Sequence, residues 1–222
     1  MSKKGIFNWF KELFIQYDSE TYDADDLTAA ILTGNIEEVS KIIDSGVDPD
    51  SPDDLCRLPI HFASEKNKAE IIELMVNKGA DIHLLDELGN TALMCGAQMD
   101  AQEACRKLLY LGIDYFLTDN KGNTALEIAI TAQHQKIINL FWERLNELNI
   151  IISKSRNEQA AKYSDKAEVE LGVVGVGAGG RTQFSKKDNF KILHFDKKSL
   201  PELELEAKRL EKMLKKTGVK PG

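Results

Sequence analysis

Leu58-Pro-Ile-His-Phe-Ala-Ser64 opens the stretch of sequence that decides the fold, and Glu70-Ile-Ile-Glu-Leu-Met-Val-Asn-Lys-Gly-Ala-Asp81 completes it. The same register returns after 33 residues in Gly89-Asn-Thr-Ala-Leu-Met-Cys-Gly-Ala97 and again in Gly122-Asn-Thr-Ala-Leu-Glu-Ile-Ala-Ile130. A weaker copy stands earlier, at Leu27-Thr-Ala-Ala-Ile-Leu-Thr-Gly-Asn35. A fixed period of this length is the sequence signature of a solenoid.

Small residues and glycines keep the same period. Small residues recur at Ala30, Ala63, Gly96 and Ala129, and glycines that end helices recur at Gly46, Gly79 and Gly112. Thr91 and Thr124 stand where the start of a helix favours a hydroxyl cap. Each copy is therefore predicted to be a turn and two short antiparallel helices, which bury their apolar faces only by stacking on neighbouring copies. The last copy has Leu145 in place of the glycine, which we interpret as the mark of an end repeat.

Together these residues resemble the ankyrin repeat. The four copies span about residues 20–52, 53–85, 86–118 and 119–149, so the repeat domain covers about residues 20–149. The resemblance implies an all-α solenoid of helix-turn-helix repeats. It also implies a non-enzymatic protein-protein interaction module, an adaptor that binds a protein partner through its concave face and turn tips.

The register of the ankyrin repeat places the candidate partner-binding residues on the turn tips and inner helices. They are Asp54, Leu55, Arg57, Glu65, Lys66, Glu87, Leu88, Asn90, Gln98, Met99, Tyr115, Phe116, Asn120, Lys121, Asn123 and Thr131. Leu88 and Met99 are apolar at positions that are normally exposed, so we expect them to anchor the partner. The alternative interpretation is that such residues only fill gaps between repeats.

Charge divides the chain into two unlike parts. Residues 1–149 hold 13 Lys and Arg against 26 Asp and Glu, a net charge of −13, whereas residues 150–222 hold 16 against 10, a net charge of +6. Acidic repeats would repel phosphates, so the composition argues against nucleic acid as their ligand. It favours a basic protein partner or the protein's own tail.

The acidic charge also supports a second function class. The alternative is a dedicated bacterial immunity or escort protein, a chaperone or adaptor for one toxin or secreted effector. A basic client would suit the acidic repeats and would associate quickly with them. A general scaffold should bind several targets, whereas an escort should copurify with one.

No group of residues in the sequence indicates catalysis, a cofactor or a metal ion. The four histidines are scattered, and the three cysteines have no metal-ligand spacing. Asp25-Asp26 and Asp53-Asp54 fall in turns at the starts of repeats, where paired carboxylates are usually solvated. Free thiols on repeat helices are typical of a reducing compartment, and no signal peptide or transmembrane stretch is apparent, so we expect a cytoplasmic location.

An aromatic segment precedes the repeats. Residues 5–17 carry Phe7, Phe10, Phe14 and Tyr17 at helical spacing, which predicts an amphipathic helix within residues 1–19. We favour a helix that caps the first repeat, and a helix that binds a partner is the second interpretation. Attachment to a membrane surface is the least favoured, because only three lysines lie nearby.

Beyond the repeats we expect a flexible, glycine-rich linker at residues 150–185 and a basic tail at residues 186–222. Gly175, Gly177 and Gly180 form the G-x-G-x-x-G string of a dinucleotide-binding turn. That motif must open a helix with an apolar face, which the following residues lack, so we interpret the string as a spacer. Residues 190–196 are compatible with a single strand.

A second amphipathic helix is predicted at residues 199–216. Ser199 and Glu202 form a capping-box pattern, and Leu203, Ala207, Leu210 and Leu214 supply an apolar stripe. Such a stripe predicts docking, either in cis on this chain or in trans on a partner. Because the tail is basic and tethered to acidic repeats, we further expect it to fold back and to compete with, or complete, the partner site.

Overall fold

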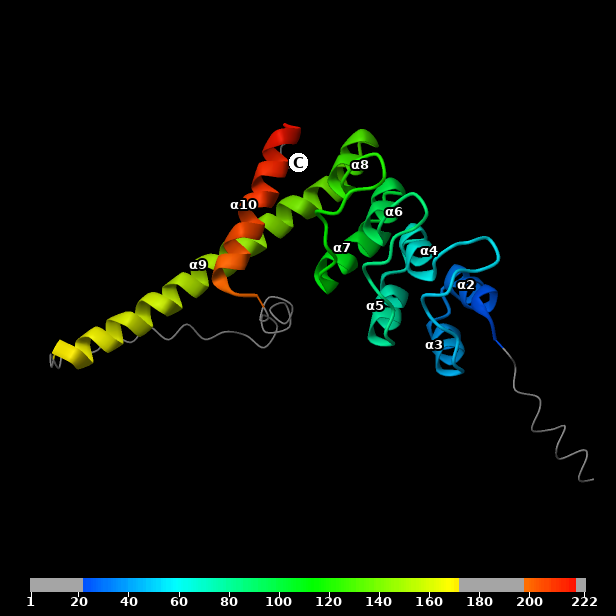
Figure 1. Cartoon of the computed structure of the whole chain (residues 1–222), viewed down its shortest axis with the longest axis horizontal. Coiled ribbons are helices and arrows are strands. Elements are labelled where there is room, and N and C mark those ends of the chain that lie inside the picture. Colours follow the sequence, from blue (N-terminus) through cyan, green and yellow to red (C-terminus); the bar gives the residue numbers. More distant parts are fainter. Residues whose placement is uncertain (1–21, 172–197, 219–222) are drawn as a thin grey trace, which may run out of the picture.

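The computed structural model of the chain (Figure 1) describes residues 22–171 and 198–218, with side chains for residues 22–158 and 198–218. Every regular element within these residues is a helix, so the expected all-α class is confirmed. The first three helix pairs are α2 (Ala24–Thr33) with α3 (Ile36–Asp44), α4 (Pro59–Glu65) with α5 (Ala69–Asn77), and α6 (Ala92–Gln98) with α7 (Gln102–Leu111). The fourth pair is α8 (Ala125–Thr131) with α9 (Gln135–Leu171), and α10 (Leu200–Thr217) follows.

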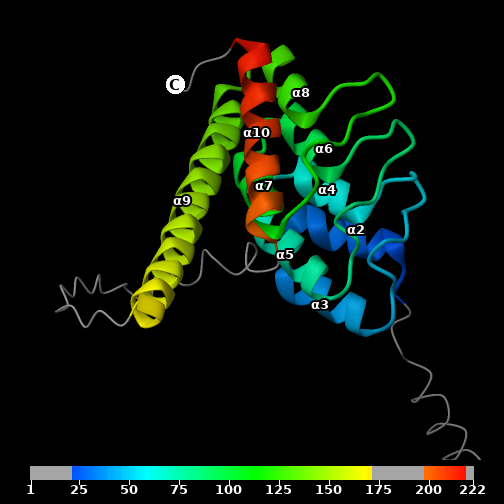
Figure 2. The same cartoon turned by 60° about the vertical axis from the view of Figure 1, so that its left-hand side comes forward.

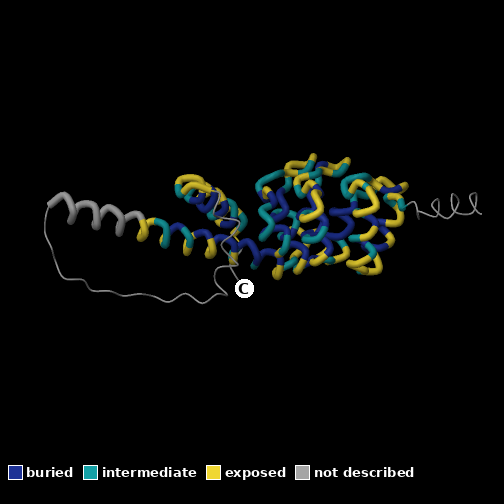
Figure 3. The backbone as a smooth tube through the Cα atoms, turned by 90° about the horizontal axis from the view of Figure 1, so that it is seen from below, coloured by how far each residue is buried: buried dark blue, intermediate teal, exposed yellow. Residues whose placement is uncertain are grey.

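The helix pairs stack in chain order. The inner helices α2, α4, α6 and α8 pack against one another in that sequence, and α3, α5, α7 and α9 form a second, outer layer. In Figure 2 the turns between pairs project beyond the inner helices, away from the outer layer. Buried residues run through the middle of the stack, and exposed residues lie on its periphery (Figure 3). This is the stacked solenoid that the 33-residue period predicts.

Side-chain caps fix where the inner helices begin. The Thr91 hydroxyl accepts a hydrogen bond from the Met94 backbone N–H at 3.3 Å, and Thr124 accepts one from Glu127 at the same distance. Each hydroxyl thereby satisfies one of the amide donors that a helix start leaves free. Helix α4 has no such side-chain bond from Leu58, but it has Pro59 in its first turn, where a missing N–H costs nothing.

A left-handed residue separates the two helices of every repeat. The four equivalent residues are Gly34, Asn67, Asp100 and Gln133, with φ of 78°, 55°, 54° and 61°. Only the first is a glycine. The other three repeats therefore hold an L-residue in a conformation that costs roughly 1–2 kcal/mol relative to right-handed geometry.

A close approach between repeats explains one of the small residues. A Cβ added to Gly96 would lie 2.5 Å from the Ser64 hydroxyl oxygen of the neighbouring inner helix and 2.9 Å from the Cys105 sulfur. The small residue at Gly96 therefore lets the inner helices α4 and α6 approach closely.

The last outer helix continues where the sequence analysis expected a linker. The outer helices of the first three repeats end at left-handed glycines, Gly46, Gly79 and Gly112. Leu145 occupies the equivalent place in the fourth repeat and is buried with only 5% of its surface exposed, so α9 does not stop there but runs on to Leu171. The prediction of a flexible linker from residue 150 is wrong as far as residue 171. Buried Leu148 and Ile152 extend the apolar stripe beyond Leu145 and explain why the helix continues through residue 152.

Helix α10 packs against α9 at the end of the stack (Figure 1). Its Ser199 backbone N–H donates to Glu202 at 2.6 Å, which closes the capping box expected from the sequence. The four apolar residues of its stripe, Leu203, Ala207, Leu210 and Leu214, are all buried. The expected helix within residues 1–19, the strand at 190–196 and the glycine string at 175–180 lie outside the described residues.

Candidate protein-binding surface

The turn tips are held by one aspartate in each of three repeats. The Asp86 carboxylate accepts hydrogen bonds from the backbone N–H of Leu88 at 2.9 Å and of Asn90 at 2.7 Å. Asp53 and Asp119 make the equivalent pairs of bonds one repeat before and one repeat after. These bonds satisfy the backbone of the turn from inside, so the two residues after each aspartate point outward.

Neighbouring tips are joined to one another. The Asn120 backbone N–H donates to the Leu88 carbonyl at 3.0 Å, and its side-chain amide donates to the Glu87 carbonyl at 3.2 Å. Behind the tips, His61 Nε2 lies 2.9 Å from the Asn90 carbonyl. Because the tips are bonded across repeats, the side chains on them form a preorganised surface rather than independent loops.

The expected partner-binding residues are mostly exposed, and they share one face of the stack. We call the exposed residues of the turn tips and inner helices the inner face. Exposed on it are Asp54, Leu55, Lys66, Glu87, Leu88, Gln98, Met99, Asn120, Lys121 and Thr131, while Arg57, Glu65, Asn90 and Asn123 are half-buried. The structure therefore brings fourteen of the sixteen candidates to one surface.

Large apolar side chains stand exposed on the inner face. Leu55 is 70% exposed, Leu88 65% and Met99 56%, so none of the three fills a gap between repeats. Leu32 is also 56% exposed and belongs to the same face, because it precedes Glu65 by one repeat. The sequence analysis missed Leu32 because it mapped only the second to fourth repeats. The 33-residue register would have found it.

Comparison with protein families identifies this architecture. The family model for ankyrin repeats, in three copies, matches residues 27–119. Residues 27–119 are ankyrin repeats. The family expected from the sequence is confirmed for this segment, and α8 with α9 adds a fourth helix pair in the same register. Comparison with curated proteins gave no match.

Ankyrin repeats are generally protein-protein interaction modules. On the inner face of these repeats, some cations already have a partner, whereas one carboxylate faces a like charge. Arg57 pairs with the buried Asp53 at 2.6 Å, and both Arg57 and Lys66 lie over the Phe62 ring. The negative charge of Asp25, in the first turn of α2, raises the pKa of the Asp54 carboxyl on the second turn tip, whose backbone N–H donates to the Asp25 carboxylate. The cations Arg57 and Lys66 thus already have partners, while the carboxylates of Asp25 and Asp54 repel each other.

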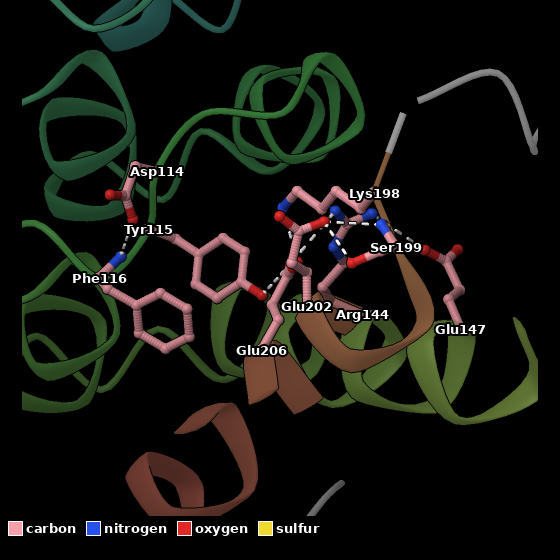
Figure 4. A network of polar contacts seen from close by, with 9 residues as sticks. All are labelled: Asp114, Tyr115, Phe116, Arg144, Glu147, Lys198, Ser199, Glu202 and Glu206. Atoms are coloured by element: carbon pink, nitrogen blue, oxygen red, sulfur yellow. Dashed lines mark hydrogen bonds and ion pairs between the residues drawn. The ribbon is translucent and has the colours of Figure 1, made fainter. Parts of the chain in front are cut away.

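Tyr115 is not available to a partner. The sequence analysis placed Tyr115 and Phe116 on the binding surface, but Tyr115 is only 4% exposed and Phe116 is half-buried. The Tyr115 hydroxyl donates to Glu206 of α10 at 2.5 Å (Figure 4). The Arg209 guanidinium lies 4.2 Å from the centre of the Phe116 ring. That prediction is wrong for Tyr115, because α10 covers the turn that carries it.

Glu206 is the centre of the contact between α10 and the repeats. Besides the Tyr115 hydroxyl, it meets Lys198 at 2.6 Å and the buried Arg144 of α9 at 3.7 Å (Figure 4). Burial raises the pKa of Glu206, but the Lys198 hydrogen bond, the Tyr115 hydrogen bond and the Arg144 charge together hold it below its ordinary value. Glu206 is therefore ionised at neutral pH.

The end of α10 also meets the fourth inner helix. Lys216 lies 3.4 Å from Glu127 of α8, beside a shallow polar depression of about 310 Å³. Its lining is Asn123, Glu127, Ile130, Thr131, Lys216 and Thr217. The tail thus contacts the fourth repeat and ends beside two of the candidate residues, Asn123 and Thr131.

Three buried titratable groups of the repeats are uncharged at neutral pH. Desolvation lowers the pKa of His61 and raises the pKa of both Cys95 and Cys105 to about 12, which leaves all three neutral at pH 7. Among the described residues, no three His, Cys, Asp or Glu side chains gather in a way that could hold a metal ion. None of the described helices is long and apolar enough to cross a membrane.

Proposed function

We propose that this chain is a non-enzymatic module that binds a protein partner through the inner face of its ankyrin repeats. The observation that carries the proposal is the exposure of Leu55 and Leu88 at equivalent places on two turn tips, with Met99 exposed at the end of the third inner helix. Exposed apolar side chains of this size on a rigid scaffold are typical of interface anchors. The sixteen candidates reduce to fourteen, because α10 contacts Tyr115 and Phe116, and Leu32 is added from the first repeat.

A basic partner suits the surface better than an acidic or neutral one. The repeats are acidic as a whole, and the carboxylates of Asp25 and Asp54 repel each other until a cation lies near them. Complementary charge speeds association and discriminates against wrong partners. The three free thiols, two of them buried, support a reducing compartment such as the cytoplasm.

The test compares proteins retained by the tagged full chain and by two variants in cells of the source organism. Leu88→Asp with Met99→Asp places two charges at the expected anchors. Ile150→Asp is the matched control, because Ile150 is equally exposed, at 65%, but lies on α9 away from the inner face. We expect the wild type and the control to retain the same proteins and the double variant to lose them.

Two readouts of the same experiment decide the class of function. If the double variant retains the same proteins as the wild type, the inner face is not the binding surface and the proposal fails. If binding is lost, the number of lost proteins separates the classes: several indicate a scaffold, whereas a single basic protein indicates an escort. Far-UV circular dichroism of the double variant should be unchanged, since both replaced side chains are exposed.

A further inference from the structure

The exposed apolar residues of the inner face repeat with the solenoid itself. Leu55 and Leu88 occupy the same place on the second and third turn tips, 33 residues apart. Leu32 and Met99 occupy neighbouring places at the ends of the first and third inner helices. Packed helices lie about 8–10 Å apart, so anchors on consecutive repeats are separated by about that distance. A partner that uses them must present apolar side chains at the same spacing.

This spacing fits a helix better than a strand. A helix rises about 1.5 Å per residue, so residues seven apart lie about 10.5 Å apart and, after two turns, on nearly the same face. In a strand, side chains on one face are separated by about 6.6 Å or about 13 Å, and neither matches. A polyproline helix also repeats, at about 9.3 Å, so a second observation must separate it from an α-helix.

The chemistry of the anchors supplies that observation. The exposed large apolar residues of the inner face are Leu32, Leu55, Leu88 and Met99, and none of them is aromatic. Polyproline segments are recognised by grooves lined with aromatic rings, whereas aliphatic and Met-bearing surfaces receive the apolar face of an amphipathic helix. The aliphatic anchors therefore favour an α-helix.

The charges beside the anchors define the flanks of that helix. Asp54 precedes Leu55 and Glu87 precedes Leu88, while Glu65 lies one repeat after Leu32. Within residues 22–158 and 198–218, no Lys or Arg forms an ion pair with any of these three carboxylates. Lysines or arginines next to the apolar stripe of the partner would supply the missing cations.

We propose that the inner face of the first three repeats binds a basic amphipathic α-helix of a partner protein, with aliphatic residues seven apart and Lys or Arg on both sides of them. This rests on the proposed function and adds the chemistry of the partner. The surface ends at the fourth repeat, because Lys121 takes the place of Leu55 and Leu88 on the fourth tip. A helix of three to four turns therefore covers the two apolar tips.

The test uses labelled peptides and the full chain. The probe is a helical peptide of roughly 20 residues with leucines at i, i+7 and i+14, flanked by lysines, in an alanine background. Three comparison peptides are a scrambled sequence of the same composition, a version with glutamates in place of the lysines, and a basic proline-rich peptide. Fluorescence anisotropy gives the dissociation constant of each for the wild type, Leu55→Ala, Leu88→Ala and the control Ile150→Ala.

We expect the basic helix to bind at least about tenfold more tightly than each comparison peptide, and to weaken as salt rises. Leu55→Ala and Leu88→Ala should each weaken it by about tenfold, and Ile150→Ala should leave it unchanged. Equal binding of the scrambled or acidic peptide, tighter binding of the proline-rich peptide, or no measurable binding would each overturn the proposal.

The two proposals fail separately. If cellular partners are lost from the Leu88→Asp, Met99→Asp variant but the basic helix does not bind, the inner face binds proteins of another shape and only this inference is wrong. If the variant keeps its cellular partners, the proposed function itself is wrong.

Discussion

Glu206→Gln is the substitution that tests most sharply how the tail is held on the repeats. It keeps the shape of a side chain that is only 8% exposed, but it removes the negative charge that Arg144 and Lys198 face. Arg144 is itself only 6% exposed, so its charge would stay in the interior without Glu206, and Glu147 lies 3.9 Å away.

The expected loss of stability can be assembled from these contacts. Lys198 is 46% exposed and can turn to water, so losing its ion pair should cost at most about 1 kcal/mol. The Tyr115 hydroxyl keeps a neutral acceptor in place of a charged one, which costs about 1 kcal/mol. Breaking a buried ion pair by removing one partner typically costs about 3–5 kcal/mol, and the remaining Glu147 contact places Arg144 at the low end. We predict a total of about 4–5 kcal/mol.

Hydrogen exchange measured by mass spectrometry locates the effect. Exchange of residues 200–217 should accelerate in Glu206→Gln, while residues 27–111 should keep their wild-type protection, because the loss falls on the contact between Tyr115 and the tail. Glu204→Gln is the matched control: Glu204 lies two residues away and pairs with the exposed Arg156, so its loss should cost less than about 1 kcal/mol. The reasoning is refuted if hydrogen exchange of α10 is equally fast in Glu206→Gln and in Glu204→Gln.

Three other measurements address the repeats and the pH dependence. Gly96→Ala should lower the free energy of unfolding in urea by about 1–3 kcal/mol, because the new Cβ would meet the Ser64 oxygen at 2.5 Å. An unchanged midpoint of urea unfolding would show that the neighbouring repeats move apart to accommodate the Cβ. Gln133→Gly should raise that free energy by up to about 1 kcal/mol, since Gln133 has a φ of 61°. Asn67→Gly, at the equivalent place, should gain less, because the Asn67 side chain accepts a hydrogen bond from the Ala104 N–H; equal gains would contradict this. The pKa of Glu206 is lowered in the folded state, so the stability that Glu206 contributes is present above the ordinary value of 4.5 and is lost as pH falls through the folded-state pKa. Hydrogen exchange of α10 in the wild type should therefore become faster in acid. In Glu206→Gln the exchange of α10 should depend less on pH.

The repeat fold was readable from the sequence because its constraints are local and periodic. Gly46, Gly79 and Gly112 recur at 33-residue spacing because each outer helix must end in a left-handed residue. Thr91 and Thr124 recur because a hydroxyl at the start of an inner helix satisfies an amide donor there, whereas α4 begins with Pro59 instead. Such signals require only nearby residues, so they survive in a single sequence.

The course of the last outer helix was misjudged for an equally local reason. Leu145 was interpreted only as the mark of an end repeat, although the absence of a left-handed residue means that nothing stops the helix there. The stripe of Leu145, Leu148 and Ile152 continues on the buried face of α9 and was the available signal. The polar residues among them concealed it.

The burial of Tyr115 could not be read from the sequence. It depends on a contact between Tyr115 and Glu206, 91 residues apart, and no periodic pattern connects them. The stripe on the last helix predicted docking, and its charge predicted an acidic target, but neither indicated which surface it would cover. In contrast, the exposure of Leu55 and Leu88 followed from the register alone.

The most direct test of the central claim is the affinity of the strongest retained partner for the inner face. Isothermal titration calorimetry gives its dissociation constant for the wild type, for Leu88→Asp with Met99→Asp, and for the control Ile150→Asp. The account predicts that the double variant binds at least about a hundredfold more weakly, with unchanged circular dichroism, and that the control binds as the wild type does. A double variant that is folded and binds within about twofold of the wild type would contradict the account.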